Sequence, residues 1–340
     1  MSRSDRGGGE KSPHLALSGH PPPKGEGLGD ATLRTFYFKE SPVPVRRGAF
    51  PIKIPRRFHF LGFTELAKYD MLSFVPCSTD LVKKWGFVMP SHGICIGFVS
   101  GKGGAGKTAL LTGIGAALAQ LGKRTLCMDC NMDFRSLDLA LGLTEQALMD
   151  FTDVVAGRCA LSDAVTEHPS QPGLFLLNAP ARDESLAETQ VRALAAGIRE
   201  QFDYCLLDAP PGLGDGFRLV TQAADRIFVV AELNPLSRRA AQRVALELEH
   251  FPPDAARLIV NRVNVRRFPF RRAELTVDDI MDSAGLPLIG LVPEDEAVSL
   301  ALSRGIPVTL LPQDGAAARA CRNIARRVTG EAVKLPRLYR

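Results

Sequence analysis

From residue 93 onward, short apolar runs alternate with longer amphipathic stretches. The runs have the length of strands and are apolar almost throughout, whereas the stretches between them have the length of helices. Strands of this kind are buried on both faces, as in parallel sheets covered by helices. We therefore predict an α/β fold with a doubly wound, mostly parallel sheet and helices on both faces. The first helix is predicted over 108–121, and the strands over 94–100, 125–129, 174–178, 204–208, 227–231, 258–261 and 288–292.

The first 88 residues show neither the two-residue period of a strand nor the 3.6-residue period of a helix, and they contain nine of the 24 prolines. Such a segment is expected to be disordered. A second explanation is that it is spurious, because Met89 directly precedes the first strand and the codons for 83–86 must be purine-rich, as in a ribosome-binding site. We therefore expect a disordered or spurious extension (1–88), one folded domain (89–330) and a short basic tail (331–340).

Charge and cysteine content narrow the function classes. Residues 1–88 carry 14 Lys and Arg against 8 Asp and Glu, whereas residues 89–340 carry 28 against 29, a net charge of −1. A body so close to neutral argues against DNA binding through a dense basic face. Seven scattered cysteines are typical of reduced thiols, and no stretch resembles a signal peptide or a membrane span. A cytoplasmic location is expected.

The segment 101–108 has the sequence G-K-G-G-A-G-K-T and fits the phosphate-loop pattern G-x-x-x-x-G-K-[ST], with a strand before it and a helix after it. Its glycines leave room for backbone N–H groups to surround phosphate oxygens. Lys107 is expected to reach the β- and γ-phosphates of ATP, and Thr108 to bind Mg²⁺. The alternative is a glycine-rich turn that binds nothing. The predicted ATP-binding residues of the loop are Gly101, Lys102, Gly103, Gly104, Ala105, Gly106, Lys107 and Thr108.

A second lysine, Lys102, follows the first glycine of the loop. A cation at this position cannot easily contact the phosphates that its own loop surrounds. It could instead project toward a nucleotide held by a facing subunit, or it could be a solvated loop lysine.

Several segments carry a resemblance to a known family. The heptapeptide 102–108 resembles the deviant Walker A motif of MinD/ParA ATPases. Residues 129–138, D-C-N-M-D-F-R-S-L-D, resemble switch I of the MinD branch, and residues 204–212, Y-C-L-L-D-A-P-P-G, resemble Walker B with switch II. Asn261-Arg262 is similar to the adenine-reading pair of the family, and 292–295 to the base-contacting loop that follows. The resemblance covers about 93–330, in the order of the family.

The resemblance implies a function and a role for each matching residue. Lys102 would cross a nucleotide-sandwich homodimer that forms on ATP binding. Asp208 would hold Mg²⁺ through water beside Thr108, and Asp129 would lie near the attacking water or the metal. Gly212 would donate its N–H near the γ-phosphate. The implied catalytic residues are Lys102, Lys107, Asp129 and Asp208, and the implied base contacts are Asn261, Arg262, Pro293, Glu294 and Asp295.

Two departures from the family pattern bear on activity. The second aspartate of switch I is Asn131, whose amide orients water but accepts no proton. We expect slow hydrolysis without a partner, unless Asp133 takes over this role. At the C-terminus, residues 328–340 are interrupted by Gly330 and Pro336, which leaves too short a segment for a strong membrane-binding helix. Weak or transient association with the inner face of the membrane is the most we expect.

The predicted function is an ATP-switched spatial regulator of cell division that places the septum, with protein partners that stimulate hydrolysis or are recruited, and without sequence-specific nucleic acid. Flagellar-number regulation and DNA partitioning are alternatives within the family. An iron–sulfur carrier is an alternative of another class, and it would need a cluster on Cys127 and Cys130. Two cysteines leave a metal half-coordinated, which argues against that alternative.

Overall fold

The computed structural model describes residues 92–132, 134–180, 186–252, 254–264 and 275–335. The predicted extension lies outside these ranges, as do residues 336–340 of the predicted tail and the side chain of Asp133.

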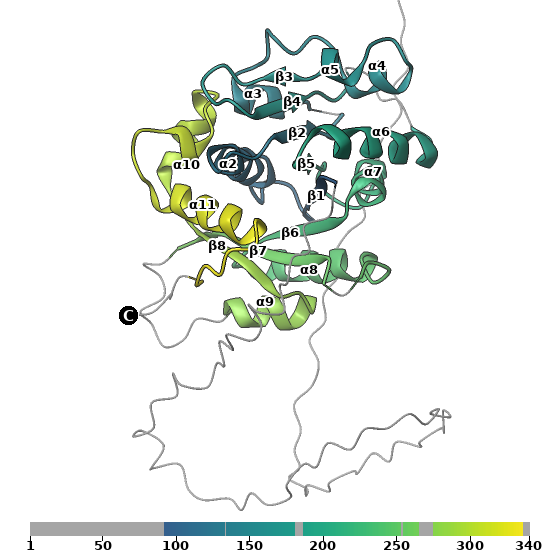
Figure 1. The fold of residues 1–340 in the computed structure, drawn as a ribbon. Coiled ribbons are helices and arrows are strands. Elements are labelled where there is room, and N and C mark those ends of the chain that lie inside the picture. Colours follow the sequence, from purple (N-terminus) through teal and green to yellow (C-terminus); the bar gives the residue numbers. More distant parts are fainter. Residues whose placement is uncertain (1–91, 133, 181–185, 253, 265–274, 336–340) are drawn as a thin grey trace, which may run out of the picture. The chain divides into compact units, whose positions relative to one another are not determined.

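Eight strands form one sheet in the order β3-β4-β2-β5-β1-β6-β7-β8 (Figure 1). Every neighbouring pair is parallel except β3 and β4, which are antiparallel. The predicted doubly wound, mostly parallel fold is thereby confirmed. The strands are β1 (Ile94–Val99), β2 (Thr125–Asp129), β3 (Thr166–Glu167), β4 (Leu174–Leu177), β5 (Tyr204–Asp208), β6 (Arg226–Glu232), β7 (Ala256–Val263) and β8 (Leu288–Pro293).

Helices cover both faces of the sheet (Figure 1). Helices α2, α3, α10 and α11 bury side chains in one apolar core, and α6, α7, α8 and α9 bury theirs in another on the opposite face. The described helices are α2 (Lys107–Gln120), α3 (Leu137–Leu141), α4 (Phe151–Val155), α5 (Leu161–Ala164), α6 (Glu188–Gln201), α7 (Asp215–Ala223), α8 (Pro235–Glu247), α9 (Val277–Ala284), α10 (Glu296–Ser303), the 3₁₀ helix η3 (Val308–Leu310) and α11 (Ala316–Val328).

The central strand β1 shows why the predicted strands are apolar throughout. Ile96 and Phe98 face the core under α2, whereas Cys95 and Val99 face the core under α6 and α7. Because successive side chains point to opposite faces, a strand covered on both faces needs apolar residues at every position.

Strand bounds agree closely with the sequence prediction. Two strands, Thr125–Asp129 and Tyr204–Asp208, have the predicted bounds, and the first helix begins one residue earlier than predicted, at Lys107. The sequence analysis missed β3, because its two residues are polar, one partly buried and one exposed, and no apolar run marks it. Its pairing with β4 is the antiparallel edge of the sheet.

The direction in which strands are added changes at β1. The chain runs from β1 to β2 on one side of the sheet, and later passes from β5 across β1 to β6 on the other side. Ligands of doubly wound sheets bind at such a switch point, in the crevice outside the carboxyl ends of the strands. The fold therefore favours a site where β1, β5 and β6 end.

The packing of α11 on β8 generates a test of the fold. A Cβ atom on Gly290 would lie 2.3 Å from Cδ1 and 2.4 Å from Cγ1 of Ile324. We expect Gly290→Ala to lower the free energy of unfolding by about 1–3 kcal/mol, because an added methyl group overpacks this contact. Urea denaturation measures the change. Gly197→Ala, in α6, is the matched control: a Cβ there meets nothing within 4 Å, and unchanged or higher stability is expected. Equal effects of both variants would contradict this packing.

Candidate active site

The loop between β1 and α2 adopts a backbone that only glycine accommodates at several positions. Gly104 and Gly106 have φ values of 78° and 90°, a region that L side chains rarely occupy. A Cβ on Gly101 would lie 2.7 Å from the carbonyl oxygen of Ala240, and one on Gly106 would lie 2.3 Å from Nδ2 of Asn261. The loop thus lies between α8 and β7. A side chain at Gly101 or Gly106 would clash with these elements, and one at Gly104 or Gly106 would strain the backbone.

Lys107 is the first residue of α2 and is buried, with 8% of its surface exposed. Its Nζ donates a hydrogen bond to Oγ of Ser100 at 3.0 Å, and this hydroxyl donates to the carbonyl oxygen of Lys102 at 2.8 Å. Burial lowers the pKa of Lys107, and the nearby Asp208 carboxylate offsets part of this effect. Ser100, which the sequence analysis did not select, therefore links the two lysines of the loop.

Asp129 and Asp208 end neighbouring strands and are register partners in the β2–β5 pair. Both carboxyl groups are buried, at 0% and 1% exposure. Burial, followed by repulsion from Asp129, raises the pKa of Asp208 to about 7, although Thr108 and Lys107 oppose the shift. Oγ1 of Thr108 donates to Oδ2 of Asp208 at 2.5 Å. Oδ1 of Asp208 is buried and has no hydrogen-bond partner among the described residues, so this oxygen is open to a cation or a water.

The carboxylate of Asp129 organises the segment that follows β2. Its two oxygens accept hydrogen bonds from the N–H groups of Asn131, at 2.8 Å, and Leu137, at 3.0 Å. Burial raises the pKa of Asp129, and these backbone donors counteract the shift. Oδ1 of Asn131 is buried without a hydrogen-bond partner in the described part of the chain. Asp129 thus has a structural role beside its predicted catalytic one, and the predicted substitution by Asp133 falls on a residue outside the described ranges.

Gly212 lies in the segment after β5 with a φ of 93°. Its N–H donates to the carbonyl oxygen of Ser100 at 3.0 Å. A contact of this N–H with a γ-phosphate, as predicted, requires that this bond first be broken.

The predicted trans-acting lysine is held within its own chain. Lys102 forms an ion pair with Glu232, the last residue of β6, and the same carboxylate accepts a hydrogen bond from Nη1 of Arg262 at 3.1 Å. The sequence analysis missed Glu232. The signal was present, because Glu232 is an acidic residue that closes an apolar strand, as Asp129 and Asp208 do.

The predicted base-contacting residues lie at the carboxyl ends of β7 and β8. Asn261 is buried and donates from Nδ2 to the carbonyl oxygen of Ala105 at 2.8 Å, which connects β7 to the phosphate loop. Arg262 has a φ of 54°, which is unusual for a residue other than glycine. Pro293 pairs with Val263 at the end of the sheet.

Glu294 and Asp295 differ in their contacts. The Glu294 carboxylate accepts one hydrogen bond from Nδ2 of Asn264, at 3.2 Å on the surface. The Asp295 carboxylate accepts from Ala297 N–H at the start of α10 and from Ala317 N–H at the start of α11, both at 3.0 Å. Asp295 therefore caps two helices, which is a structural role that the sequence analysis did not foresee.

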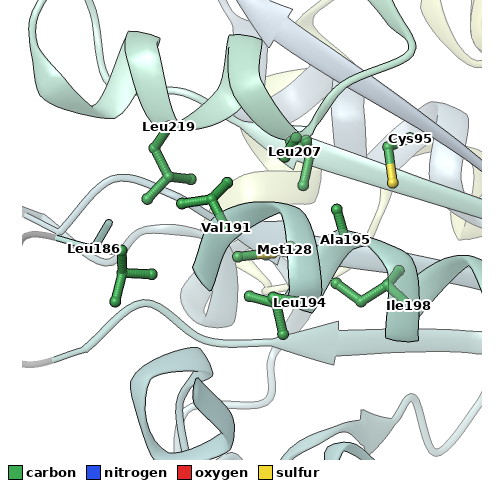
Figure 2. Close-up of a pocket in the computed structure, with 10 residues that line it drawn as sticks. Cys95, Met128, Leu186, Val191, Leu194, Ala195, Ile198, Leu207 and Leu219 are labelled. Carbon is green, nitrogen blue, oxygen red and sulfur yellow. The ribbon is translucent and has the colours of Figure 1, made fainter. Parts of the chain in front are cut away.

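The two cysteines of the C-x-x-C sequence flank Asp129, and the N–H of Cys130 donates to the carbonyl oxygen of Asp208 at 3.0 Å, but their thiols do not come together. Cys127 and Cys130 are fully buried in different cores, on opposite faces of the sheet, and burial raises the pKa of both thiols. Figure 2 shows an apolar cavity between the sheet, α6 and α7, lined by side chains that include Met128, Val191 and Leu219. It offers no charged group. Among the described residues, no helix is long and apolar enough to span a membrane.

Comparison with known proteins gives consistent matches. Residues 96–308 match the model of the CobQ/CobB/MinD/ParA nucleotide binding domain. The chain is 34% identical over 251 residues to the septum site-determining protein MinD of Bacillus subtilis. The aligned region covers 72% of this chain and 91% of that protein. It is also 34% identical over 235 residues to the MinD of Synechocystis, with coverage of 68% and 88%.

A solved structure, the MinC:MinD cell division protein complex of Aquifex aeolicus, contains a chain that is 33% identical to this one. The two superimpose with a TM-score of 0.65, covering 72% of this chain and 99% of that chain.

The double cap by Asp295 generates a test that separates structure from nucleotide binding. We expect Asp295→Ala to lower the free energy of unfolding by about 1–3 kcal/mol, because two helix N-termini lose their acceptor. Thermal or urea denaturation without nucleotide measures this change. Glu294→Ala removes the neighbouring exposed carboxylate and serves as the control, with a change within about 0.5 kcal/mol. If Asp295→Ala weakens ATP binding at unchanged stability, the capping role is refuted.

Proposed function

The chain belongs to the MinD/ParA family of nucleotide-binding proteins, and on this premise we propose that it is an ATP-dependent, dimerising switch that acts as a MinD-type regulator of septum placement. ATP hydrolysis is the activity of this family. The family predicted from the sequence motifs is confirmed by the match over 96–308 and by the MinD relatives. The observation that carries the proposal is the convergence of Lys107, Thr108 and Asp208 at the switch point of the sheet.

ATP is the substrate that suits the phosphate loop and the neighbouring Lys107, Thr108 and Asp208. The N–H groups of the glycine-rich loop and the positive end of α2 attract phosphate oxygens. The buried ammonium group of Lys107 adds a full charge where the β- and γ-phosphates would lie. Asn261, anchored to Ala105, and Arg262 would bind the base end of the nucleotide.

Mg²⁺ fits the same site, because Asp208 keeps one buried oxygen without a hydrogen bond from the described residues and lies next to the Thr108 hydroxyl. Thr108 would bind the ion directly and Asp208 would hold it through water. Bound there, Mg²⁺ would supply charge neutralisation for the β- and γ-phosphates. A cation would also relieve the repulsion between Asp208 and Asp129 that contributes to the raised pKa of Asp208.

Asn131 supports slow hydrolysis in the absence of a partner. Its amide oxygen is buried and has no hydrogen-bond partner in the described structure, next to Asp129. This oxygen can orient an attacking water but cannot take its proton. A partner that completes the site would then control the rate, and hydrolysis would reset the switch.

A protein partner of the MinC kind is part of the proposal, because a 33% identical MinD occurs in a complex with MinC in the Aquifex aeolicus structure. We place the protein in the cytoplasm with weak or transient membrane association. Residues 331–335 form no helix. Arg327 donates hydrogen bonds to the carbonyl oxygens of Ile289, Val333 and Lys334 and so holds this part of the tail against the body. The near-neutral body gives no support for the DNA-partitioning alternative.

The two lysines of the loop give the central test. Lys107→Ala is expected to abolish ATP binding, because it removes the charge that faces the phosphates. Lys102→Ala is expected to bind ATP but to lose ATP-dependent dimerisation and to hydrolyse ATP slower by a factor of about 10³ or more, since a cation supplied in trans is lost. Isothermal titration, light scattering with a non-hydrolysable analogue, and ATPase assays measure the three properties.

Mixing variants checks whether each site is completed across the dimer. Lys102→Ala mixed with Asp129→Asn should regain part of the activity, because one of the two sites then contains an intact Asp129 and a Lys102 from the other subunit. Each variant alone is the control. Normal dimerisation and hydrolysis by Lys102→Ala would show instead that the enzyme acts in cis.

Asn131 gives a second test. Asn131→Asp is expected to raise the turnover number at least about tenfold, because a carboxylate at this position can accept the proton of the attacking water. ATP affinity should change little, and steady-state kinetics separates the two effects. A turnover number that stays the same or falls would mean that Asp129 or Asp133 already performs this task.

A further inference from the structure

Glu232 lies between the phosphate loop and the end of β7. It ends β6, which pairs with β1 on one side and with β7 on the other, where Glu232 is the register partner of Asn261. Its side chain is 13% exposed, whereas those of Lys102 and Arg262 are 26% and 55% exposed. From this position the carboxylate contacts Lys102, in the loop after β1, and Arg262, in β7.

Three donors hold this carboxylate. Oε2 accepts hydrogen bonds from Nζ of Lys102 and, at 3.2 Å, from Nδ2 of Asn234, and Oε1 accepts from Nη1 of Arg262. Burial by itself raises the pKa of Glu232, but the Lys102, Arg262 and Asn234 donors outweigh burial and lower it. Glu232 is therefore ionised at neutral pH, and its charge is directed at Lys102.

The backbone around Glu232 is fixed independently of its side chain. The N–H of Glu232 donates to Oγ of Ser237 at 2.8 Å, and the N–H of Ser237 donates to Oδ1 of Asn234, the N-cap of α8, at 2.8 Å. Asn234 thus caps the helix with its oxygen and holds Glu232 with its nitrogen. The backbone that carries the carboxylate is thus bonded to the start of α8, and Lys102 is the more exposed partner of the ion pair.

We propose that Glu232 is a cis latch that holds Lys102 against its own subunit in the monomer and is released when the dimer closes. This inference rests on the proposed function, because it takes Lys102 as the residue that crosses the interface. Lys102 is directed at Glu232 of its own chain, and in the proposal its ammonium group leaves this carboxylate for the phosphates of a facing nucleotide. Closure of the dimer then breaks this ion pair, and the pair disfavours dimerisation until ATP is present on both subunits.

Glu232→Gln is the discriminating variant, because it keeps the shape of the side chain and one acceptor oxygen but removes the charge. The first measurement needs no nucleotide and no dimer. Acetylation of Lys102 by a water-soluble N-hydroxysuccinimide ester, quantified by mass spectrometry against Lys123 and Lys334 in the same chain, reports how firmly the amine is held. We expect Lys102 to react about threefold to tenfold faster in the variant, as for the loss of a partly exposed charge-assisted hydrogen bond.

The second measurement is the protein concentration for half-dimerisation with a non-hydrolysable ATP analogue, followed by light scattering. It should fall about threefold to tenfold in Glu232→Gln, since the latch no longer opposes closure. Glu188→Gln, which removes a carboxylate paired with Arg192 on the exposed face of α6, is the matched charge control. It should change neither measurement.

The two measurements separate the latch from the proposed function. Equal acetylation of Lys102 in the wild type and in Glu232→Gln overturns the latch. Faster acetylation with unchanged or weaker dimerisation also overturns it, because Glu232 would then not oppose closure. Faster acetylation in a protein that never dimerises with ATP supports the hold on Lys102 and overturns the proposed function instead.

Discussion

Two carboxyl groups buried side by side impose the main constraint on this site. Asp129 and Asp208 end adjacent strands in register, and neither is exposed to solvent in a way that would screen their repulsion. The pKa of Asp208 rises to about 7 because burial and then Asp129 disfavour its charge. Such a pair is costly in a buried position, and a bound cation would offset the repulsion between the two carboxylates. This arrangement of charge is the physical basis for the Mg²⁺–ATP site proposed above.

The order of the strands in the sheet decides which charged residues lie close to Asp129 and Asp208. The carboxyl ends of β2, β5, β1, β6 and β7 are successive along the sheet, so residues distant in sequence meet along one line. Asp129, Asp208 and Glu232 occupy the last positions of three of these strands. A parallel sheet therefore converts one sequence feature, an acidic residue that closes an apolar run, into a row of carboxylates facing the phosphate loop.

The sequence predicted those parts that depend on local pattern. Buried strands such as Thr125–Asp129 and the loop with its required glycines follow from residue type and spacing. The contacts of long side chains depend on tertiary register and were not predictable in this way. Asp295 was assigned to the base by resemblance, and its carboxylate also caps two helices: α10, which directly follows it, and α11, which only the packing of α11 beside β8 brings within reach. Glu232 ends an apolar run, as Asp129 and Asp208 do, but its contact with Lys102 depends on β6 lying next to β1, and no spacing in the sequence reveals that neighbour.

Lys102 and Lys107 have different surroundings because β1 lies between β5 and β6. Both lysines belong to the loop after β1. Lys107 begins the helix and is buried toward the β5 side, where Asp208 raises its pKa against the effect of burial. Lys102 precedes the helix, stays partly exposed and meets Glu232 on the β6 side. In the proposed function Lys107 therefore serves the nucleotide of its own subunit, whereas the proposed latch lets Lys102 exchange Glu232 for an anion outside the chain. The sheet thus places the two lysines of one short loop beside different carboxylates, Asp208 and Glu232.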